Sequence, residues 1–97
     1  MVAYVIKGTY TETGREYFLD NMSYVFDKNN MKYLRLSDCY KTAKAAKMVA
    51  TKKTKANAEQ AAYYERCNET RVANGKEPFD YAFNKCVYEA YAVEVEK

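Results

Sequence analysis

The first third of the chain consists of short apolar runs separated by polar segments, a pattern typical of β-strands. Val2, Tyr4 and Ile6 fall on one side of an extended chain, and similar runs recur after short polar segments. These runs are rich in β-branched and aromatic residues, which pack well on a sheet. We predict a β-meander of three or four short antiparallel strands over residues 1–36. The extended runs are residues 2–7, 16–19, 23–26 and 31–36, and turn-forming residues occupy 11–14, 20–21 and the hairpin loop 27–30.

A helical pattern replaces these short runs over residues 37–74. Ser37 or Asp38 can cap a helix, and neither glycine nor proline occurs from there to Asn74. Apolar residues recur at helical spacing, and most are alanines, which let a helix approach a sheet closely. The residues of this stripe are Cys39, Ala43, Ala46 and Ala50, continued by Ala58, Ala61 and Ala62.

The segment Thr51–Lys55 decides whether one helix or two form. It contains two β-branched residues and three lysines, which disfavour an uninterrupted helix. We therefore expect two helices, over about 38–50 and about 56–73. The alternative is a continuous helix, which would align the lysines on both sides of the segment in one linear basic ridge. Those lysines are Lys41, Lys44, Lys52 and Lys55.

The C-terminal residues 78–97 predict a short helix followed by a strand. Pro78 can open a helix over 79–83, and alternating apolar residues over 86–95 predict a strand that returns to the sheet. A helix over 79–91 is the competing interpretation, because apolar residues there also fit the helical period. The whole pattern predicts a single α+β domain over residues 1–97, with a small antiparallel sheet covered on one face by two helices.

Positive charge is concentrated between Lys28 and Lys55. This window holds nine basic residues and one acid, Asp38, for a net charge of +8, whereas the rest of the chain is net −5. A concentrated basic segment points to an anionic partner, either nucleic acid or an acidic protein surface. A membrane surface is a poor fit, because the apolar side of the predicted helix is mostly alanine.

Little in the sequence indicates catalysis or metal binding. The chain has no histidine, and Cys39, Cys67 and Cys86 are widely spaced and best interpreted as reduced thiols. No phosphate-binding glycine motif and no nucleophile motif occur. We expect a protein without enzymatic activity, metal or cofactor. The absence of a signal peptide and of a long apolar run predicts a cytoplasmic protein.

Lysines and tyrosines of the basic window are the candidate binding residues. The lysines would face phosphates or carboxylates, and the aromatic side chains would stack on bases or fill apolar pockets. A purely solvating role is weakened by the scarcity of acids that could pair with the lysines. The eleven tyrosines indicate either an interface or a base-composition bias of the gene. The candidates are Lys32, Tyr33, Arg35, Tyr40, Lys41, Lys44, Lys47, Lys52, Lys53 and Lys55.

The layout resembles that of small accessory proteins encoded by tailed bacteriophages. These combine a short N-terminal meander with Ala/Lys-rich helical sequence and sometimes a final strand. The segments that carry the resemblance are Tyr4-Val5-Ile6-Lys7, Tyr17-Phe18-Leu19-Asp20, residues 45–53 and Ala92-Val93-Glu94-Val95. The resemblance implies a class of viral proteins that bind and redirect a host machine, such as a polymerase, a nuclease, a protease or a defence complex.

These observations predict a non-catalytic binding protein, phage-encoded and active in the host cytoplasm as a monomer or small homo-oligomer. It would dock on an acidic host protein or nucleoprotein complex through its basic Lys/Tyr surface and modulate or inhibit it. The alternative is a sequence-tolerant nucleic-acid-binding protein that contacts the phosphate backbone.

Overall fold

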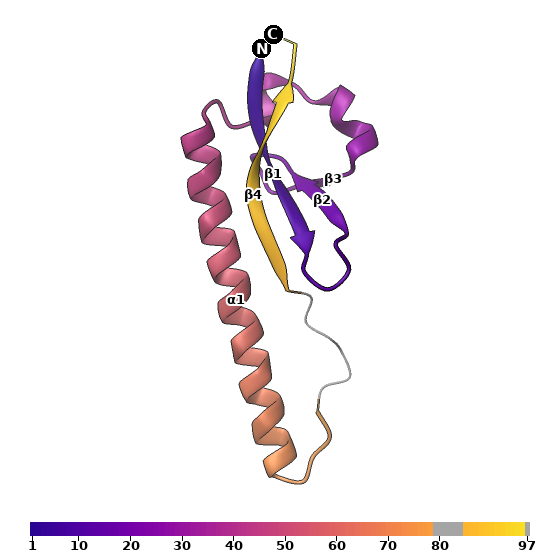
Figure 1. Ribbon diagram of the computed structural model, residues 1–97, viewed down its shortest axis with the longest axis vertical. Helices are drawn as coiled ribbons and strands as arrows, with labels where there is room; N and C mark the ends of the chain where they lie inside the picture. Colours follow the sequence, from indigo (N-terminus) through magenta and orange to yellow (C-terminus); the bar gives the residue numbers. More distant parts are fainter. Residues whose placement is uncertain (79–84, 97) are drawn as a thin grey trace.

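Four antiparallel strands form one sheet in the order β3-β2-β1-β4, so the first and last strands of the chain are neighbours (Figure 1). The computed structural model describes residues 1–78 and 85–96. The strands are β1 (Val2–Tyr10), β2 (Glu16–Leu19), β3 (Val25–Phe26) and β4 (Cys86–Glu94). The predicted α+β class and antiparallel sheet are confirmed.

The pairing of β1 with β4 is the longest in the sheet. Nine residue pairs join the strands, from Val2 opposite Glu94 to Tyr10 opposite Cys86. Beyond them, the N-terminal ammonium donates to the Val95 carbonyl at 3.1 Å and forms an ion pair with Glu94 at 3.1 Å. The predicted C-terminal strand is therefore confirmed over Cys86–Glu94, and the competing helix is wrong there. The predicted short helix over 79–83 lies outside the described residues.

A single helix, α1 (Ala43–Ala73, 31 residues), replaces the two that we expected. It starts later than predicted, because Thr42 rather than Ser37 or Asp38 caps it, accepting the Ala45 N–H at 3.2 Å. The helix runs without a break through Thr51–Lys55, which is the alternative that the sequence left open. Its far end extends past the sheet (Figure 1).

Contacts with β4 account for the continuity of α1. The Thr54 hydroxyl accepts the Tyr88 N–H at 2.9 Å and lies 3.3 Å from the Tyr88 carbonyl oxygen, to which it donates. The Asn57 side-chain oxygen accepts the Cys86 N–H at 2.9 Å. Both β4 amides point away from β1, at the open edge of the sheet. The helix thus satisfies edge groups of β4, and this tertiary bonding outweighs the weak helix propensity of Thr54.

The predicted strand over 31–36 and its hairpin loop over 27–30 are wrong. The chain instead forms two 3₁₀ turns, η1 (Lys28–Tyr33) and η2 (Leu36–Asp38). Asp27 starts the first turn by accepting the Asn29 N–H at 3.0 Å. Local side-chain bonding of this kind competes with strand pairing.

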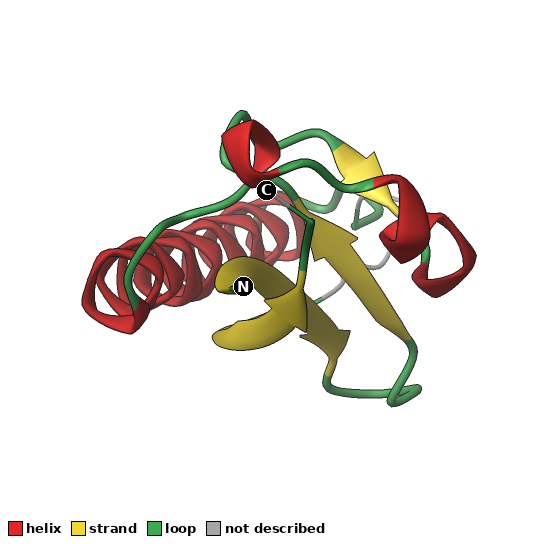
Figure 2. Cartoon of the chain, turned by 90° about the horizontal axis from the view of Figure 1, so that it is seen from above, coloured by secondary structure: helices red, strands yellow, loops and turns green. Residues whose placement is uncertain are grey.

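The two faces of the sheet carry separate apolar cores. On one face, Ile6 and Leu19 pack against Ala46 and Ala50 of α1. On the other face, the core is covered by the segment that contains η1 and η2, and its members are Ala3, Val5, Phe18, Cys39, Val93 and Val95, with Met31, Leu34 and Leu36 packed against them. Figure 2 shows the strands between α1 and η1. Both faces of β1 are therefore buried, which explains its nearly continuous apolar sequence.

We predict that Thr54→Val lowers the free energy of unfolding by about 1–2 kcal/mol, because the Tyr88 N–H and C=O both lose their partner. Chemical denaturation measures this change. The matched control is Thr51→Val, the same substitution at an exposed position of α1. Equal stability of the two variants would contradict the role given to the Thr54 hydroxyl.

Candidate interaction surface

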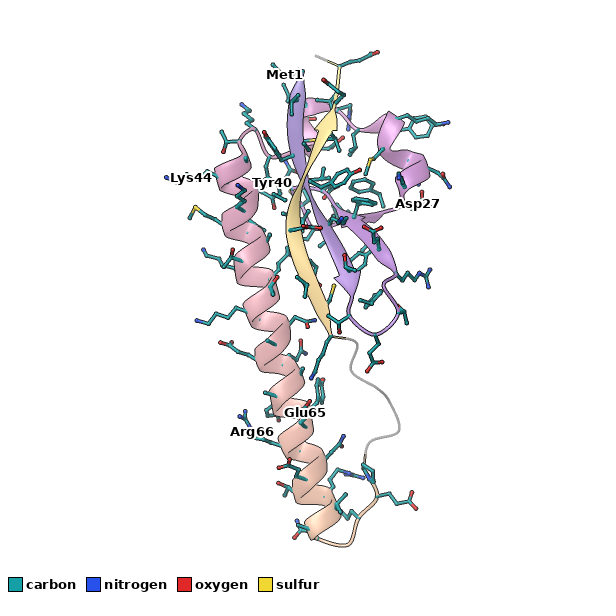
Figure 3. The ribbon with its side chains drawn as sticks, viewed as in Figure 1. Met1, Asp27, Tyr40, Lys44, Glu65 and Arg66 are labelled. Atoms are coloured by element: carbon teal, nitrogen blue, oxygen red, sulfur yellow. The ribbon has the colours of Figure 1, made fainter. Side chains whose placement is uncertain are left out.

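The helix gathers four of the ten candidate residues on one exposed face. Lys44, Lys52 and Lys55 are exposed on the side of α1 opposite the buried Ala46 and Ala50, and the exposed Lys47 lies at the border of that side. We call these four the lysine ridge. The ridge extends about 16 Å along the axis, since each helical residue adds about 1.5 Å. In Figure 3 Lys44 points away from the sheet, whereas Tyr40 lies beside the strands.

The ridge lysines have no acidic partner among the residues that the structure describes. No acid occurs in the sequence from Lys41 to Ala58, and no ion pair within residues 1–78 and 85–96 involves a ridge lysine. Lys7 shows the contrast, with its ammonium 2.8 Å from Glu89 and 3.0 Å from Glu16. Hydrogen bonds to Glu89 and Glu16 raise the pKa of Lys7 to about 12. The ridge therefore presents positive charge that this part of the chain leaves uncompensated.

An apolar centre lies within the ridge. Met48 is 54% exposed, and with Thr51 and three ridge lysines it lines a shallow, open depression of about 600 Å³. Lysine stems are aliphatic, so the floor of this depression is apolar and its rim is cationic. Such a surface fits an apolar group flanked by anions. Met48 is not among the candidates predicted from the sequence, although its position four residues after Lys44 indicates the same helix face.

Three candidate residues near α1 lie off the ridge. Tyr40 is half-buried and bridges β1, donating its N–H to the Tyr4 carbonyl at 2.8 Å and accepting the Tyr4 N–H at 2.9 Å. Burial, with a smaller contribution from Asp20, raises the pKa of Tyr40. Lys53 donates to the Ser23 hydroxyl at 3.0 Å, and Lys41 is exposed just before the helix. The Tyr40 side chain packs against the core on the helix side of the sheet and is only partly exposed, which makes it a poor platform for base stacking.

The other three candidates lie on the opposite side of the sheet. Lys32, Tyr33 and Arg35 line an open cleft of about 1100 Å³ between the 3₁₀ segment and the end of β4. The Lys32 ammonium lies 5.2 Å from the centre of the Tyr33 ring, and the Arg35 guanidinium lies 3.6 Å from Asp38. Glu94 and Glu96 also line this cleft, so its charge is mixed. The ten candidates thus form two separate groups rather than one surface.

Several tyrosines serve packing. The Tyr17 hydroxyl lies 2.7 Å from the Tyr88 hydroxyl and 3.5 Å from the Cys86 sulfur, and the Tyr10 ring lies 5.3 Å from that of Tyr17. The Tyr17 ring covers Gly8, where a Cβ atom would lie 2.7 Å from the ring. Only glycine leaves room for the ring there. The tyrosine excess therefore has a structural component.

The part of the chain that the structure describes contains neither a candidate metal site nor a candidate membrane-spanning helix. Residues 1–78 and 85–96 contain no group of three or more histidine, cysteine or carboxylate side chains that could hold a metal ion. No helix in the same residues is long and apolar enough to cross a membrane. Comparisons with protein-family models, curated proteins and solved structures found no match.

We predict that the protein loses stability as the pH rises above about 10, the ordinary range of tyrosine. Desolvation, with hydrogen bonds to Cys86 and Tyr88, raises the pKa of Tyr17, and desolvation also raises the pKa of Tyr88. Above this pH the unfolded chain ionises first, so unfolding becomes more favourable. Denaturant unfolding at a series of pH values measures the effect.

The phenylalanine variant Tyr17→Phe should make this pH dependence shallower, because it removes one group that resists ionisation in the folded state. Tyr33→Phe, on an exposed side chain, is the control. A pH profile that is the same for Tyr17→Phe and the parent protein would contradict the assignment.

Proposed function

We propose that this chain is a non-catalytic binding protein whose lysine ridge docks on an acidic protein surface. The observation that carries the proposal is the set of four exposed lysines on α1, which form no ion pair with residues 1–78 or 85–96 and are arranged around the exposed Met48. Cationic rims with apolar centres suit protein interfaces, in which desolvated apolar contacts supply affinity and charges supply orientation and association rate.

The distribution of charge along α1 supports binding over simple solvation. The second half of the helix mixes Glu59, Glu65 and Glu69 with Arg66 and Arg71, whereas the first half carries lysine alone. Like charges three or four residues apart destabilise a helix by about 0.2–0.5 kcal/mol per pair. Carboxylates of a bound partner would offset this repulsion between the lysines, so relief of the repulsion would favour binding.

The positions of Tyr33 and Tyr40, the two aromatic residues among the ten candidates, favour a protein partner over nucleic acid. Binding to unpaired nucleic acid combines a basic groove with aromatic platforms for the bases. Tyr40 is half-buried, and Tyr33 lies on the other side of the sheet from the ridge. The exposed apolar side chain of the ridge is Met48, which offers no stacking surface.

The resemblance to phage accessory proteins supports a host macromolecule as the partner. The expected consequence of binding is modulation or inhibition of that host protein or nucleoprotein complex. A surface of four lysines would recognise it through clustered carboxylates rather than through a specific base sequence.

Affinity capture from nuclease-treated bacterial lysate tests the proposal. We expect the immobilised chain to retain a partner after nuclease treatment, and Lys44→Glu with Lys52→Glu to reduce capture at least about tenfold, because two attractive contacts become repulsive. Quantitative mass spectrometry of the bound proteins measures the change.

The matched control is Lys28→Glu with Lys76→Glu, which alters net charge equally at exposed lysines away from the ridge. Equal loss in both double variants would indicate unspecific charge attraction. Capture that disappears with nuclease and falls steeply with salt would indicate nucleic acid as the ligand.

A further inference from the structure

The turn between β2 and β3, together with the first residue of β3, exposes three large apolar side chains. Met22 is 70% exposed, and Tyr24 and Val25 are each 69% exposed. None of the three belongs to the apolar cores of the sheet. Adjacent exposed apolar residues on a small protein are typical of interaction sites.

The backbone of this turn is held firmly. One Asp20 carboxylate oxygen accepts the Met22 N–H at 2.8 Å and the Tyr24 N–H at 3.0 Å, and the Asp20 N–H donates to the Tyr24 carbonyl at 3.1 Å. The Asn21 side chain donates to the Ser37 carbonyl at 2.8 Å. Ser23 has a φ of 63°, a left-handed conformation that these bonds hold in place. The apolar side chains are therefore presented on a preorganised backbone, which lowers the entropy cost of binding.

A direct contact joins the turn to the helix that bears the ridge. The Lys53 ammonium donates to the Ser23 hydroxyl at 3.0 Å. Ser23 lies between Met22 and Tyr24, and Lys53 follows the ridge residue Lys52 in the sequence. Consecutive helical residues lie about 100° apart, so Lys53 lies toward the sheet and off the ridge, and the turn approaches α1 next to Lys52 rather than along the whole ridge.

We propose that the turn is the apolar anchor of the interface whose electrostatic part is the lysine ridge. The partner is an acidic protein surface with an apolar recess that receives Tyr24 and Met22, while its carboxylates face Lys52 and the other ridge lysines. This inference rests on the proposed function and adds the apolar contact to it. Charge complementarity selects this occupant, because a second copy of the chain would bring one lysine ridge near another.

Selection from a library of random short peptides on the immobilised chain tests the anchor without knowledge of the natural partner. We expect the enriched peptides to combine acidic residues with an aromatic or long aliphatic residue. Tyr24→Ala should weaken the most enriched peptide at least about tenfold, because an aromatic anchor dominates a small interface. Fluorescence anisotropy measures the affinity.

Tyr33→Ala is the matched control, because Tyr33 is 70% exposed but lies on the other side of the sheet. Circular dichroism verifies that both variants fold, and Tyr24→Phe, which keeps the ring, should retain most of the affinity. Loss in Tyr24→Ala with retention in Tyr33→Ala supports the anchor.

The remaining outcomes distinguish failure of the apolar anchor from failure of the lysine ridge as a binding surface. Purely acidic peptides that depend on Lys44 and Lys52 but not on Tyr24 would overturn the anchor and leave the proposed function standing. Peptides without acidic residues, or binding that is insensitive to both sites, would overturn both. Concentration-dependent dimerisation that is lost in Tyr24→Ala would overturn the acidic partner in favour of a second copy.

Discussion

Antiparallel pairing between the two ends of the chain is the constraint on which the remaining structure depends. β1 and β4 pair over their full length although most of the sequence lies between them. Such a contact closes a very long loop, so its entropy cost must be offset by burial on both faces of the sheet. Two segments of the intervening chain supply that burial: α1 on one face, and the segment with η1 and η2 on the other. The lysines of Lys28–Lys55 are distributed on both of these covering segments.

The way α1 attaches to the sheet determines which of its residues remain free. Small alanines approach the sheet, and the side chains of Thr54 and Asn57 satisfy the edge of β4. Because these bonds also keep the helix continuous at Thr51–Lys55, Lys44 and Lys55 belong to one linear face. A bent or broken helix would have separated them. The stability of the sheet edge and the shape of the proposed interface thus depend on the same few contacts.

Local sequence patterns predicted the strands of the sheet better than they predicted the segments that cover its two faces. The apolar runs at 2–7 and 86–95 indicated strands because their side chains pack on both faces of the sheet. The strand predicted at 31–36 is wrong because Asp27 favours a local turn. The break predicted at Thr51–Lys55 is wrong because Thr54 bonds to Tyr88 of β4, a residue far away in the sequence. The charge pattern likewise identified the basic window. Only the fold shows that Lys32 and Lys44 lie on different sides of the sheet, because contacts between residues far apart in the sequence decide which face each segment covers.

The proposed interface requires that the ridge lysines contact carboxylates of a protein partner. Carbodiimide cross-linking of the complex tests it most directly, because the reagent joins an amine to a carboxylate only where the two are in contact. We expect amide bonds between the partner's aspartates or glutamates and Lys44, Lys47, Lys52 or Lys55. Cross-links confined to Lys28, Lys32 or Lys76, with the ridge lysines unmodified by the partner, would contradict it.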